Sequence, residues 1–254
     1  LAGPARSTEE ARSLTRMNAQ LAELEEALAS HKAQLEAKDA EALILQEGMD
    51  STIRQKKEMH VDQGTADEAL NAQIDTIILD NSKKLSAIID SILQACADKL
   101  DDALYELETP SSAAMTASTP EYVLSLIEKA QASSNEFTAV FSLFVEQQEV
   151  GGDHVNVIKS ANQLAQAMCD SLVNVKGILR FCKSEEAMDR LTSVAVDAGH
   201  ILLRFFLNIQ SYRLAGMTPQ QRTNVAVQQN AQVSTALGRL ADSAQSLVGQ
   251  RPWQ

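Results

Sequence analysis

The sequence contains 254 residues, carries a net charge of −12, and only 4% of its residues are aromatic. This length is sufficient for one or two domains with buried cores. The small and aliphatic residues favour a helical bundle over a β-sandwich, and the negative charge argues against nucleic acid as a partner.

The first predicted helix runs from about residue 7 to residue 59 and carries one narrow apolar stripe. Its apolar residues recur at alternating intervals of three and four. We define the seam by these residues: Leu14, Met17, Leu21, Leu24, Leu28, Leu35 and Leu45. A repeat that averages 3.5 residues keeps the stripe facing a partner helix, as in a coiled coil. Polar residues at His31 and Lys38 interrupt the seam and weaken it. Residues 1–63 are therefore predicted to be the end of a parallel dimeric coiled coil and to make the chain a homodimer.

A second long helix is predicted over residues 65–108, after a break at Asp62-Gln63-Gly64. Its doubled positions, such as Ile77-Ile78 and Ile88-Ile89, widen the apolar face beyond that of a two-stranded coiled coil. Residues 109–119 are rich in Ser, Thr and Ala and are predicted to form a flexible loop. The second half of this helix is expected to join a bundle.

Four further helices are predicted from their start and stop signals. They span residues 120–149, 153–182, 185–215 and 219–248. Thr119, Asp153, Ser184 and Thr218 are the predicted N-caps, and proline follows the first and the last of them. Short connections force consecutive helices to be antiparallel. Residues 64–254 are therefore predicted to form an antiparallel four- to five-helix bundle, so the fold class is all-α.

Nothing in the sequence predicts secretion or a membrane span. The N-terminus lacks the apolar core of a signal peptide, and the most apolar stretch, residues 201–209, is short and contains Arg204. Cys96, Cys169 and Cys182 lack metal-type spacing and are typical of reduced thiols in a cytosolic protein. We therefore expect a cytoplasmic location.

The sequence also lacks a catalytic or metal-binding motif, so no enzyme activity and no cofactor are predicted. An enzyme with a metal site inside a helical bundle is the alternative from a different class, and it would need Glu-x-x-His pairs. None of the four histidines has Glu three positions before it. His200, between Gly199 and Ile201, is expected to be packed or interfacial and not a ligand.

The last predicted helix differs from the others in its small side chains. Its apolar face includes Ala226 and Ala244, and little apolar area holds such a face in place. We expect this helix to detach most easily, although a tight, Ala-packed helix fits the same pattern.

Four blocks of the sequence share one resemblance: residues 88–110 (IIDSILQACADKLDDALYELETP), 119–130 (TPEYVLSLIEKA), 137–144 (FTAVFSLF) and 172–180 (LVNVKGILR). In this order they resemble the middle region of a fungal member of the huntingtin-interacting-protein family of endocytic adaptors. The resemblance covers about residues 65–250, with a generic coiled coil ahead of it. It is structural, and no functional residue is carried over.

The resemblance implies a non-enzymatic segment that interacts and transmits force in an adaptor linking clathrin-coated membrane to actin. In that family a phosphoinositide-binding domain comes first, then a coiled coil that meets clathrin light chain, then this helical region and a talin-like actin-binding tail. Phosphoinositide membrane and actin are therefore expected partners only through modules absent here, at endocytic actin patches of the cell cortex. The alternative is a vinculin- or talin-like cytoskeletal bundle that binds a partner helix.

Overall fold

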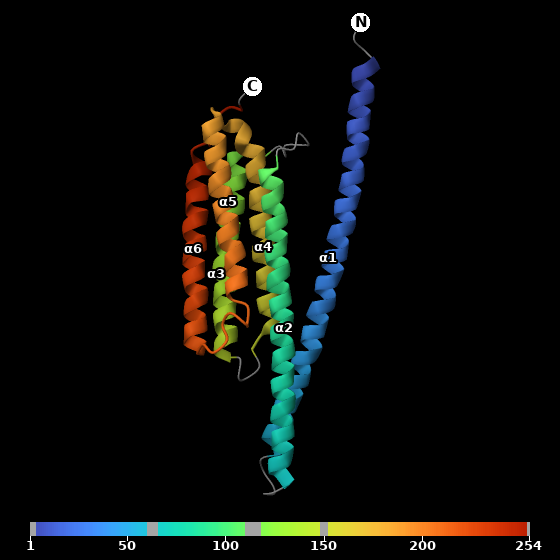
Figure 1. Ribbon diagram of the computed structural model, residues 1–254, viewed down its shortest axis with the longest axis vertical. Helices are drawn as coiled ribbons and strands as arrows, with labels where there is room; N and C mark the ends of the chain where they lie inside the picture. Colours follow the sequence, from blue (N-terminus) through green and yellow to red (C-terminus); the bar gives the residue numbers. More distant parts are fainter. Residues whose placement is uncertain (1–3, 60–65, 110–117, 148–151, 253–254) are drawn as a thin grey trace. The chain divides into compact units, whose positions relative to one another are not determined.

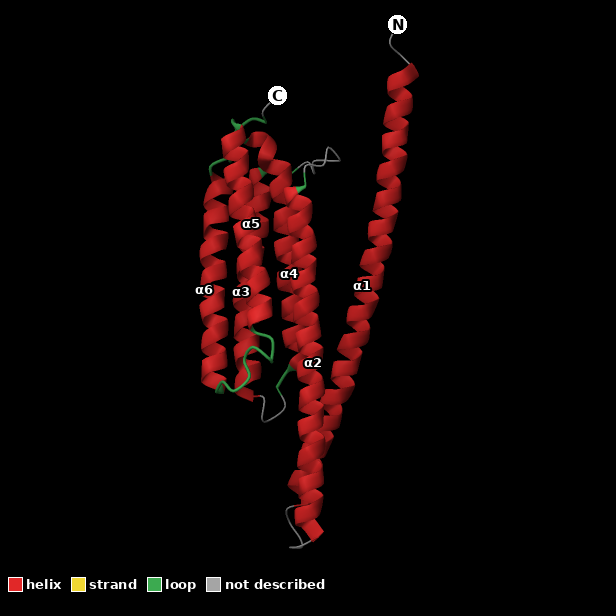
Figure 2. Cartoon of the chain, viewed as in Figure 1, coloured by secondary structure: helices red, strands yellow, loops and turns green. Residues whose placement is uncertain are grey.

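The computed structural model describes residues 4–59, 66–109, 118–147 and 152–252. Within these ranges the chain forms six α-helices and one short 3-10 helix, and no strand (Figure 2). The all-α prediction is confirmed. The chain divides into two compact units, residues 1–44 and residues 45–254.

The helices follow one another along the chain without an intervening strand in the described residues. Their bounds are α1 Pro4–Met59, α2 Ala66–Glu108, α3 Pro120–Gln147, α4 His154–Ile178, η2 Leu179–Phe181, α5 Glu185–Asn208 and α6 Pro219–Gln245. The predicted break at Asp62-Gln63-Gly64 and most of the predicted loop 109–119 lie outside the described residues.

The predicted N-caps bind the first turns of their helices. The Asp153 side chain accepts a hydrogen bond from the Asn156 amide at 3.0 Å, and Ser184 accepts one from the Ala187 amide at 3.2 Å. Thr218 and Gln221 form a reciprocal capping box. These local bonds satisfy amides that have no partner inside the helix, so the cap predictions are confirmed.

Helices α2 to α6 pack as a bundle in the second unit (Figure 1). Helix α2 contacts α4 and α5, helix α3 contacts α4 and α6, and α5 contacts α6, so the five helices form a closed ring. Helices α4 and α5 are consecutive but contact each other little, because α2 lies between them. The short connection between α4 and α5 therefore does not make them full packing neighbours.

The directions of the helices follow from contacts between their side chains. On α2 and α4 the paired positions increase together, from Cys96 with Asn162 to Glu106 with Lys176, so these helices run parallel. On α3 and α6 the order reverses, since Gln131 binds Ser234 and Ser134 binds Asn230. Helices α2, α4 and α6 thus point one way, and α3 and α5 point the other way.

Aromatic rings fill the centre of the bundle. The Phe137 ring on α3 lies 5.6 Å from that of Phe205 and 5.8 Å from that of Phe206, both on α5. All three side chains are fully buried. Such edge-to-face pairs add to the stabilisation that burial alone provides, which agrees with the apolar faces of these helices in the sequence.

Helix α5 ends at Asn208, seven residues before the predicted end at residue 215. The chain leaves the helix there because Gln210 turns into the bundle, where it is 3% exposed. Its side-chain amide donates to the Asp90 carbonyl oxygen at 3.3 Å and to Gln94 Oε1 at 3.2 Å. The predicted ends at residues 182 and 248 also lie beyond the observed ends of α4 and α6, and the predicted end at residue 149 lies outside the described residues.

The last part of α1 belongs to the second unit. Lys56 forms an ion pair with Asp75 of α2, and Gly48 lies close to Asn81 of the same helix. Residues 45–59 and the start of α2 therefore form an antiparallel helical hairpin. The predicted boundary at Gly64 lies outside the described residues and stays a prediction.

Candidate interaction surface on the first helix

The seam gives α1 an exposed apolar stripe within the first unit. Helix formers such as Ala, Leu and Glu dominate residues 15–44, so the helix continues without a break. Leu21, Leu24 and Leu28 are 52%, 69% and 63% exposed. Leucines three and four positions apart share one face of a helix, so these three exposed side chains form one apolar patch. Single exposed leucines are common on protein surfaces, whereas a contiguous apolar patch is typical of an interaction site. This stripe is the best candidate for an interaction surface among the described residues.

The other seam residues differ in their exposure. Leu35 and Leu45 are half-buried, and the side chains of Leu14 and Met17 lie outside the described residues. His31 is exposed, and Lys38 forms an ion pair with Glu41 at 3.0 Å. The structure therefore supports exposure of the seam at Leu21, Leu24 and Leu28, whereas dimerisation through it stays a prediction.

The repeat continues past Leu45 to a partner inside the same chain. Met49, at the next position of the repeat, is 3% exposed, in the part of α1 that lies against α2. Thr52 donates its hydroxyl to the Gly48 carbonyl oxygen at 2.8 Å, so it is satisfied within its own helix. The sequence repeat alone does not reveal that Met49 is covered within the same chain, because any partner helix would bury the same stripe.

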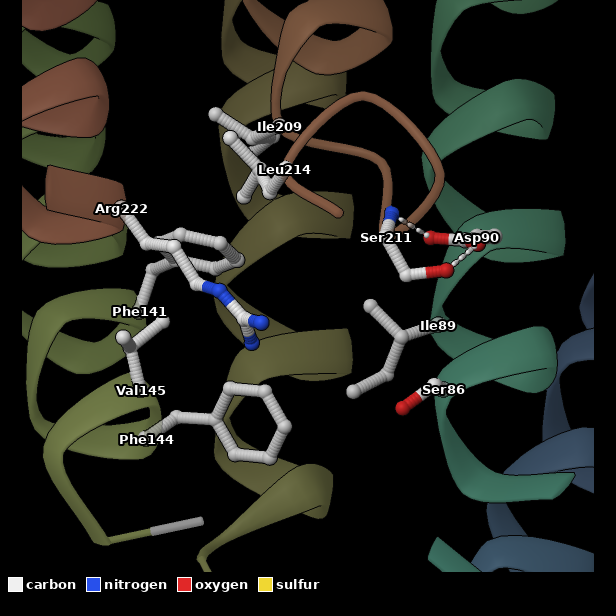
Figure 3. A pocket seen from close by; sticks show the side chains of 10 residues that line it. All are labelled: Ser86, Ile89, Asp90, Phe141, Phe144, Val145, Ile209, Ser211, Leu214 and Arg222. Carbon is white, nitrogen blue, oxygen red and sulfur yellow. Dashed lines mark hydrogen bonds between the residues drawn. The ribbon is translucent and has the colours of Figure 1, made fainter. Parts of the chain in front are cut away.

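A second candidate is a small cavity beside the connection between α5 and α6. About 40 Å³ is enclosed by Ile89 of α2, Phe141 and Phe144 of α3, and Ile209 and Leu214 after α5 (Figure 3). The Arg222 side chain reaches into the cavity, and Ser86 and Asp90 line its other side. A space of this size holds about one or two water molecules and no larger ligand.

Hydrogen bonds show what this region does. The Ser211 amide donates to Asp90 Oδ1 at 2.7 Å, and the Ser211 hydroxyl also binds the Asp90 carboxylate (Figure 3). Together with the Gln210 bonds, these contacts fasten the α5–α6 connection to α2. The cavity therefore lies in a region whose hydrogen bonds hold the α5–α6 connection against α2.

A row of polar contacts joins α3 to α6. Gln131 Nε2 donates to Ser234 Oγ at 2.7 Å, Ser134 Oγ donates to Asn230 Oδ1 at 2.6 Å, and Asn230 Nδ2 donates to Asn135 Oδ1 at 3.0 Å. Ser134 is fully buried. The apolar pattern of α6 did not reveal this row, although the frequency of Ser, Asn and Gln in both helices was the available signal.

The three cysteines of the bundle are buried. Burial raises the pKa of the Cys96 thiol to about 12 and that of Cys169 to about 11, and it also raises the pKa of Cys182. All three cysteines are free. Within the described ranges, no three His, Cys, Asp or Glu side chains converge as metal ligands. High thiol pKa values make these cysteines poor nucleophiles.

Two histidines of the bundle lie in different surroundings. His200, expected to be packed or interfacial, is exposed. His154, at the start of α4, is the buried one, and its ring lies 4.7 Å from that of Phe144 in an edge-to-face contact. Burial lowers the pKa of His154. This position follows from the packing of α3 against α4, which no local signal encodes.

None of the helices in the described ranges has a stretch long and apolar enough to span a lipid bilayer.

In the described residues, a helix with exposed leucines and a bundle of five helices define an all-helical protein. Across 261 aligned residues the chain is 26% identical to "Endocytosis protein end4" of Schizosaccharomyces pombe. This alignment covers 96% of this chain and 24% of that protein. The chain is also 22% identical over 196 residues to "Protein SLA2" of Saccharomyces cerevisiae, and this alignment covers 77% of this chain and 20% of that protein.

The chain is therefore homologous to these two fungal proteins, and the resemblance to the huntingtin-interacting-protein family of endocytic adaptors is confirmed. It spans about a quarter of the length of the first relative and a fifth of the second. No family model matches the chain. No solved structure matches it either.

Proposed function

We propose that this chain is a non-enzymatic interaction and force-transmitting segment of an endocytic adaptor, and that it acts as a dimer. Homology to "Endocytosis protein end4" over 96% of the chain supports the endocytic role. The exposed leucines of the seam support association, because burying each would contribute about 1.5–3 kcal/mol. The exposed stripe of Leu21, Leu24 and Leu28 is the observation that carries this proposal.

The proposed dimer is parallel and ends near residue 45. A regular 3.5-residue repeat keeps two supercoiled helices in contact along one seam. Beyond Leu45 the same face of α1 is occupied by α2, as the burial of Met49 and the Lys56–Asp75 ion pair indicate. The second copy would therefore pair along the first unit and leave each bundle separate.

The proposed partners of the whole adaptor follow from the family resemblance. Clathrin light chain would bind the coiled coil, whereas phosphoinositide membrane and actin would be bound by other modules. The place of action would be cytoplasmic, at endocytic actin patches of the cell cortex. In this arrangement the bundle carries load between the modules on either side of it.

Charged substitutions in the seam test whether the chain dimerises through it. The double variant Leu24→Asp and Leu28→Asp should sediment as a monomer, because two carboxylates cannot be buried in an apolar seam. Ala22→Asp with Ala29→Asp is the matched control, since both alanines are exposed and lie beside the seam. A seam variant that sediments like the wild-type dimer would contradict the assignment of the seam.

The endocytic role is tested by exchange into a relative. In Schizosaccharomyces pombe, the matched region of the end4 protein is replaced by this chain, and uptake of a fluorescent endocytic tracer is measured. We expect the chimera to restore uptake, the seam variant to lose it, and the Ala22/Ala29 control to keep it. A wild-type chimera that is expressed and folded but does not restore uptake would contradict the proposed function.

A second candidate function is a bundle that opens to receive a partner helix. The row of polar contacts between α3 and α6 favours it, because these contacts contribute less to stability than apolar packing of equal area. Helix α6 would be the helix that leaves. Binding of a helical peptide that increases hydrogen exchange in α6 would support this function.

A further inference from the structure

The connection between α5 and α6 presents an exposed Thr-Pro pair where it meets α6. Thr218 and Pro219 are both exposed, and so are residues 215–216 and 220–221 around them. Thr218 has an extended backbone, with φ −68° and ψ 158°, and α6 begins at the next residue. Exposed connecting segments are the parts of a fold that other proteins reach most easily. The Thr218 hydroxyl is therefore accessible to the active site of another protein.

A second Thr-Pro pair lies at the start of α3 and differs in its exposure. Thr119 is exposed, but Pro120 is buried and Ser118 is only 4% exposed. The Arg180 side chain also donates to the Ser118 carbonyl oxygen at 3.0 Å. An enzyme that recognises the proline after the threonine would first have to open this part of the bundle, which costs free energy. Of these two pairs, only the pair at α6 is presented for recognition. The proline of a third pair, Thr109-Pro110, lies outside the described residues.

The connection is fastened on its inner side, which leaves the Thr-Pro pair on its outer side. Gln210 and Leu214 are each 3% exposed, and the Leu214 amide donates to the Gln210 carbonyl oxygen at 3.2 Å. The Met217 amide donates to the Leu214 carbonyl oxygen at 3.2 Å. Residues 219–221, in the first turn of α6, are exposed, and the first buried residue of this helix is Ala226. Straightening the first turn in an active site would therefore uncover no fully buried side chain.

A positively charged group lies next to the Thr-Pro pair. Arg222 Nε donates to the Met217 carbonyl oxygen at 3.1 Å, so the guanidinium lies beside the residue that precedes Thr218. The first acidic residue after Thr218 is Asp242. Asp90 lines the opposite side of the cavity that Arg222 enters, and its carboxylate accepts hydrogen bonds from the connection (Figure 3). A phosphate on Thr218 would therefore meet a cation and the positive end of a helix dipole.

We propose that Thr218 is a phosphorylation site for a proline-directed protein kinase, the class of kinase that modifies a Ser or Thr followed by Pro. The Thr218 oxygen attacks the γ-phosphorus of ATP, and the bond from that phosphorus to the β–γ bridging oxygen breaks. ADP leaves, and the hydroxyl proton passes to the catalytic carboxylate of the kinase. The Gln221 amide, which donates to Thr218 Oγ1 at 3.2 Å, then donates to a phosphate oxygen. The Arg222 guanidinium binds the same phosphate and holds the start of α6 against the connection.

This site goes beyond the proposed endocytic role, and its test uses the purified chain and does not depend on dimerisation through α1. The folded chain is incubated with ATP, Mg²⁺ and a purified mitogen-activated protein kinase, which is a proline-directed enzyme. Mass spectrometry of peptides then locates and quantifies the phosphate. We expect Thr218 to be modified at least about tenfold faster than Thr119, because Pro120 becomes accessible only by local opening.

Three variants assign the phosphate to its residue. Thr218→Val should remove the modification, and Thr218→Ser, which keeps the hydroxyl and the helix cap, should retain it. Thr119→Val is the matched control and should leave the phosphate on Thr218 unchanged. Modification of Thr218 no faster than that of Thr119 would overturn the proposal. Modification of Thr218 only after the chain is unfolded in urea would also overturn it.

The gain in melting temperature on phosphorylation tests the role of Arg222. Phosphorylation should raise the melting temperature of the wild type, and most of this gain should be lost in Arg222→Gln. Comparing each variant with and without phosphate separates the gain from the effect of the substitution itself. Arg213→Gln, which removes an exposed arginine of the same connection, is the matched control and should keep the gain. An equal gain in Arg222→Gln and the wild type would contradict binding of the phosphate by Arg222.

Phosphorus NMR provides a measurement that needs no variant, in case Arg222→Gln does not fold. In the phosphorylated wild type, the pKa of the Thr218 phosphate should lie below its usual value of about 6, because a nearby cation favours the doubly charged form. The same titration of the chain unfolded in urea should return the usual value. A phosphate pKa that is equal in the folded and unfolded chain would overturn the proposed contact.

Discussion

Gly199 of α5 lies directly against Leu104 of α2. A β-carbon on Gly199 would come within 2.6 Å of Leu104 Cδ2, and Leu104 is only 2% exposed. The close packing of these two antiparallel helices therefore depends on the absence of a side chain at position 199.

Replacing Gly199 should destabilise the bundle. Gly199→Ala should lower the free energy of unfolding by about 1–3 kcal/mol, because the buried Leu104 side chain would have to shift to make room for the added methyl group. Gly238→Ala is the matched control. No atom lies within 4 Å of a β-carbon at that position, so the variant should gain about 0.5–1 kcal/mol from helix propensity. Urea unfolding of both variants measures the difference, and equal effects would contradict the close contact.

Removing Asn230 should weaken the attachment of α6. Asn230→Ala leaves the buried Ser134 hydroxyl without its acceptor, which costs about 1–3 kcal/mol. Gln228→Ala, on an exposed position of the same helix, should change the free energy of unfolding by less than about 0.5 kcal/mol. Chemical denaturation compares the two. If Asn230→Ala lowers the free energy of unfolding no more than Gln228→Ala does, the polar contacts between α3 and α6 do not stabilise the bundle.

Helix α6 should also exchange its amide hydrogens faster than α4. Its buried face includes Ala226, Ala236 and Ala244, which contribute little apolar area, and part of its contact with α3 is polar. Local opening occurs in such elements of low stability. Native-state hydrogen exchange should show lower protection in residues 219–248 than in residues 153–182. Equal or greater protection in α6 would contradict the idea of a helix that opens.

Acid should destabilise the bundle through His154. Burial lowers the pKa of His154 from the usual 6.5, although the Gly152 carbonyl, Asp153 and Asp50 oppose this shift. The unfolded chain therefore takes up the proton first as the pH falls. The stability contributed by neutral His154 is complete above the unfolded pKa and is lost as the pH falls below it, at up to about 1.4 kcal/mol per pH unit.

The variant His154→Leu should remove this dependence. Between pH 7.5 and 5, its melting temperature should fall less steeply than that of the wild type. His200→Leu, at an exposed position, is the control and should keep the wild-type slope. Parallel curves for the wild type and His154→Leu would contradict the assignment to His154.

Local features of this fold could be predicted from the sequence, and tertiary features could not. The caps at Asp153, Ser184 and Thr218 were predictable because each side chain binds an amide three residues ahead. The end of α5 was not, because Gln210 leaves the helix to bind Asp90 and Gln94, more than a hundred residues away. The apolar pattern of α5 does not indicate that contact.

The same distinction applies to the candidate interaction surface. Leu21, Leu24 and Leu28 were predicted to need a partner from their spacing, and their exposure agrees with that prediction. The burial of Met49 in the same chain could not be predicted, because a heptad repeat gives the shape of a stripe and not the identity of the helix that covers it.

The parallel course of α2, α4 and α6 determines how the bundle would respond to pulling. Within the second unit, α6 ends at the end of the bundle opposite the α1–α2 hairpin (Figure 1). Tension between residue 45 and Pro252 would thus act along the helix axes. Helix α6 would be loaded in shear against α3 and α5, so all its contacts would share the force and would not break one after another as in peeling. The chain should therefore resist stretching along its length much better than a force applied across it.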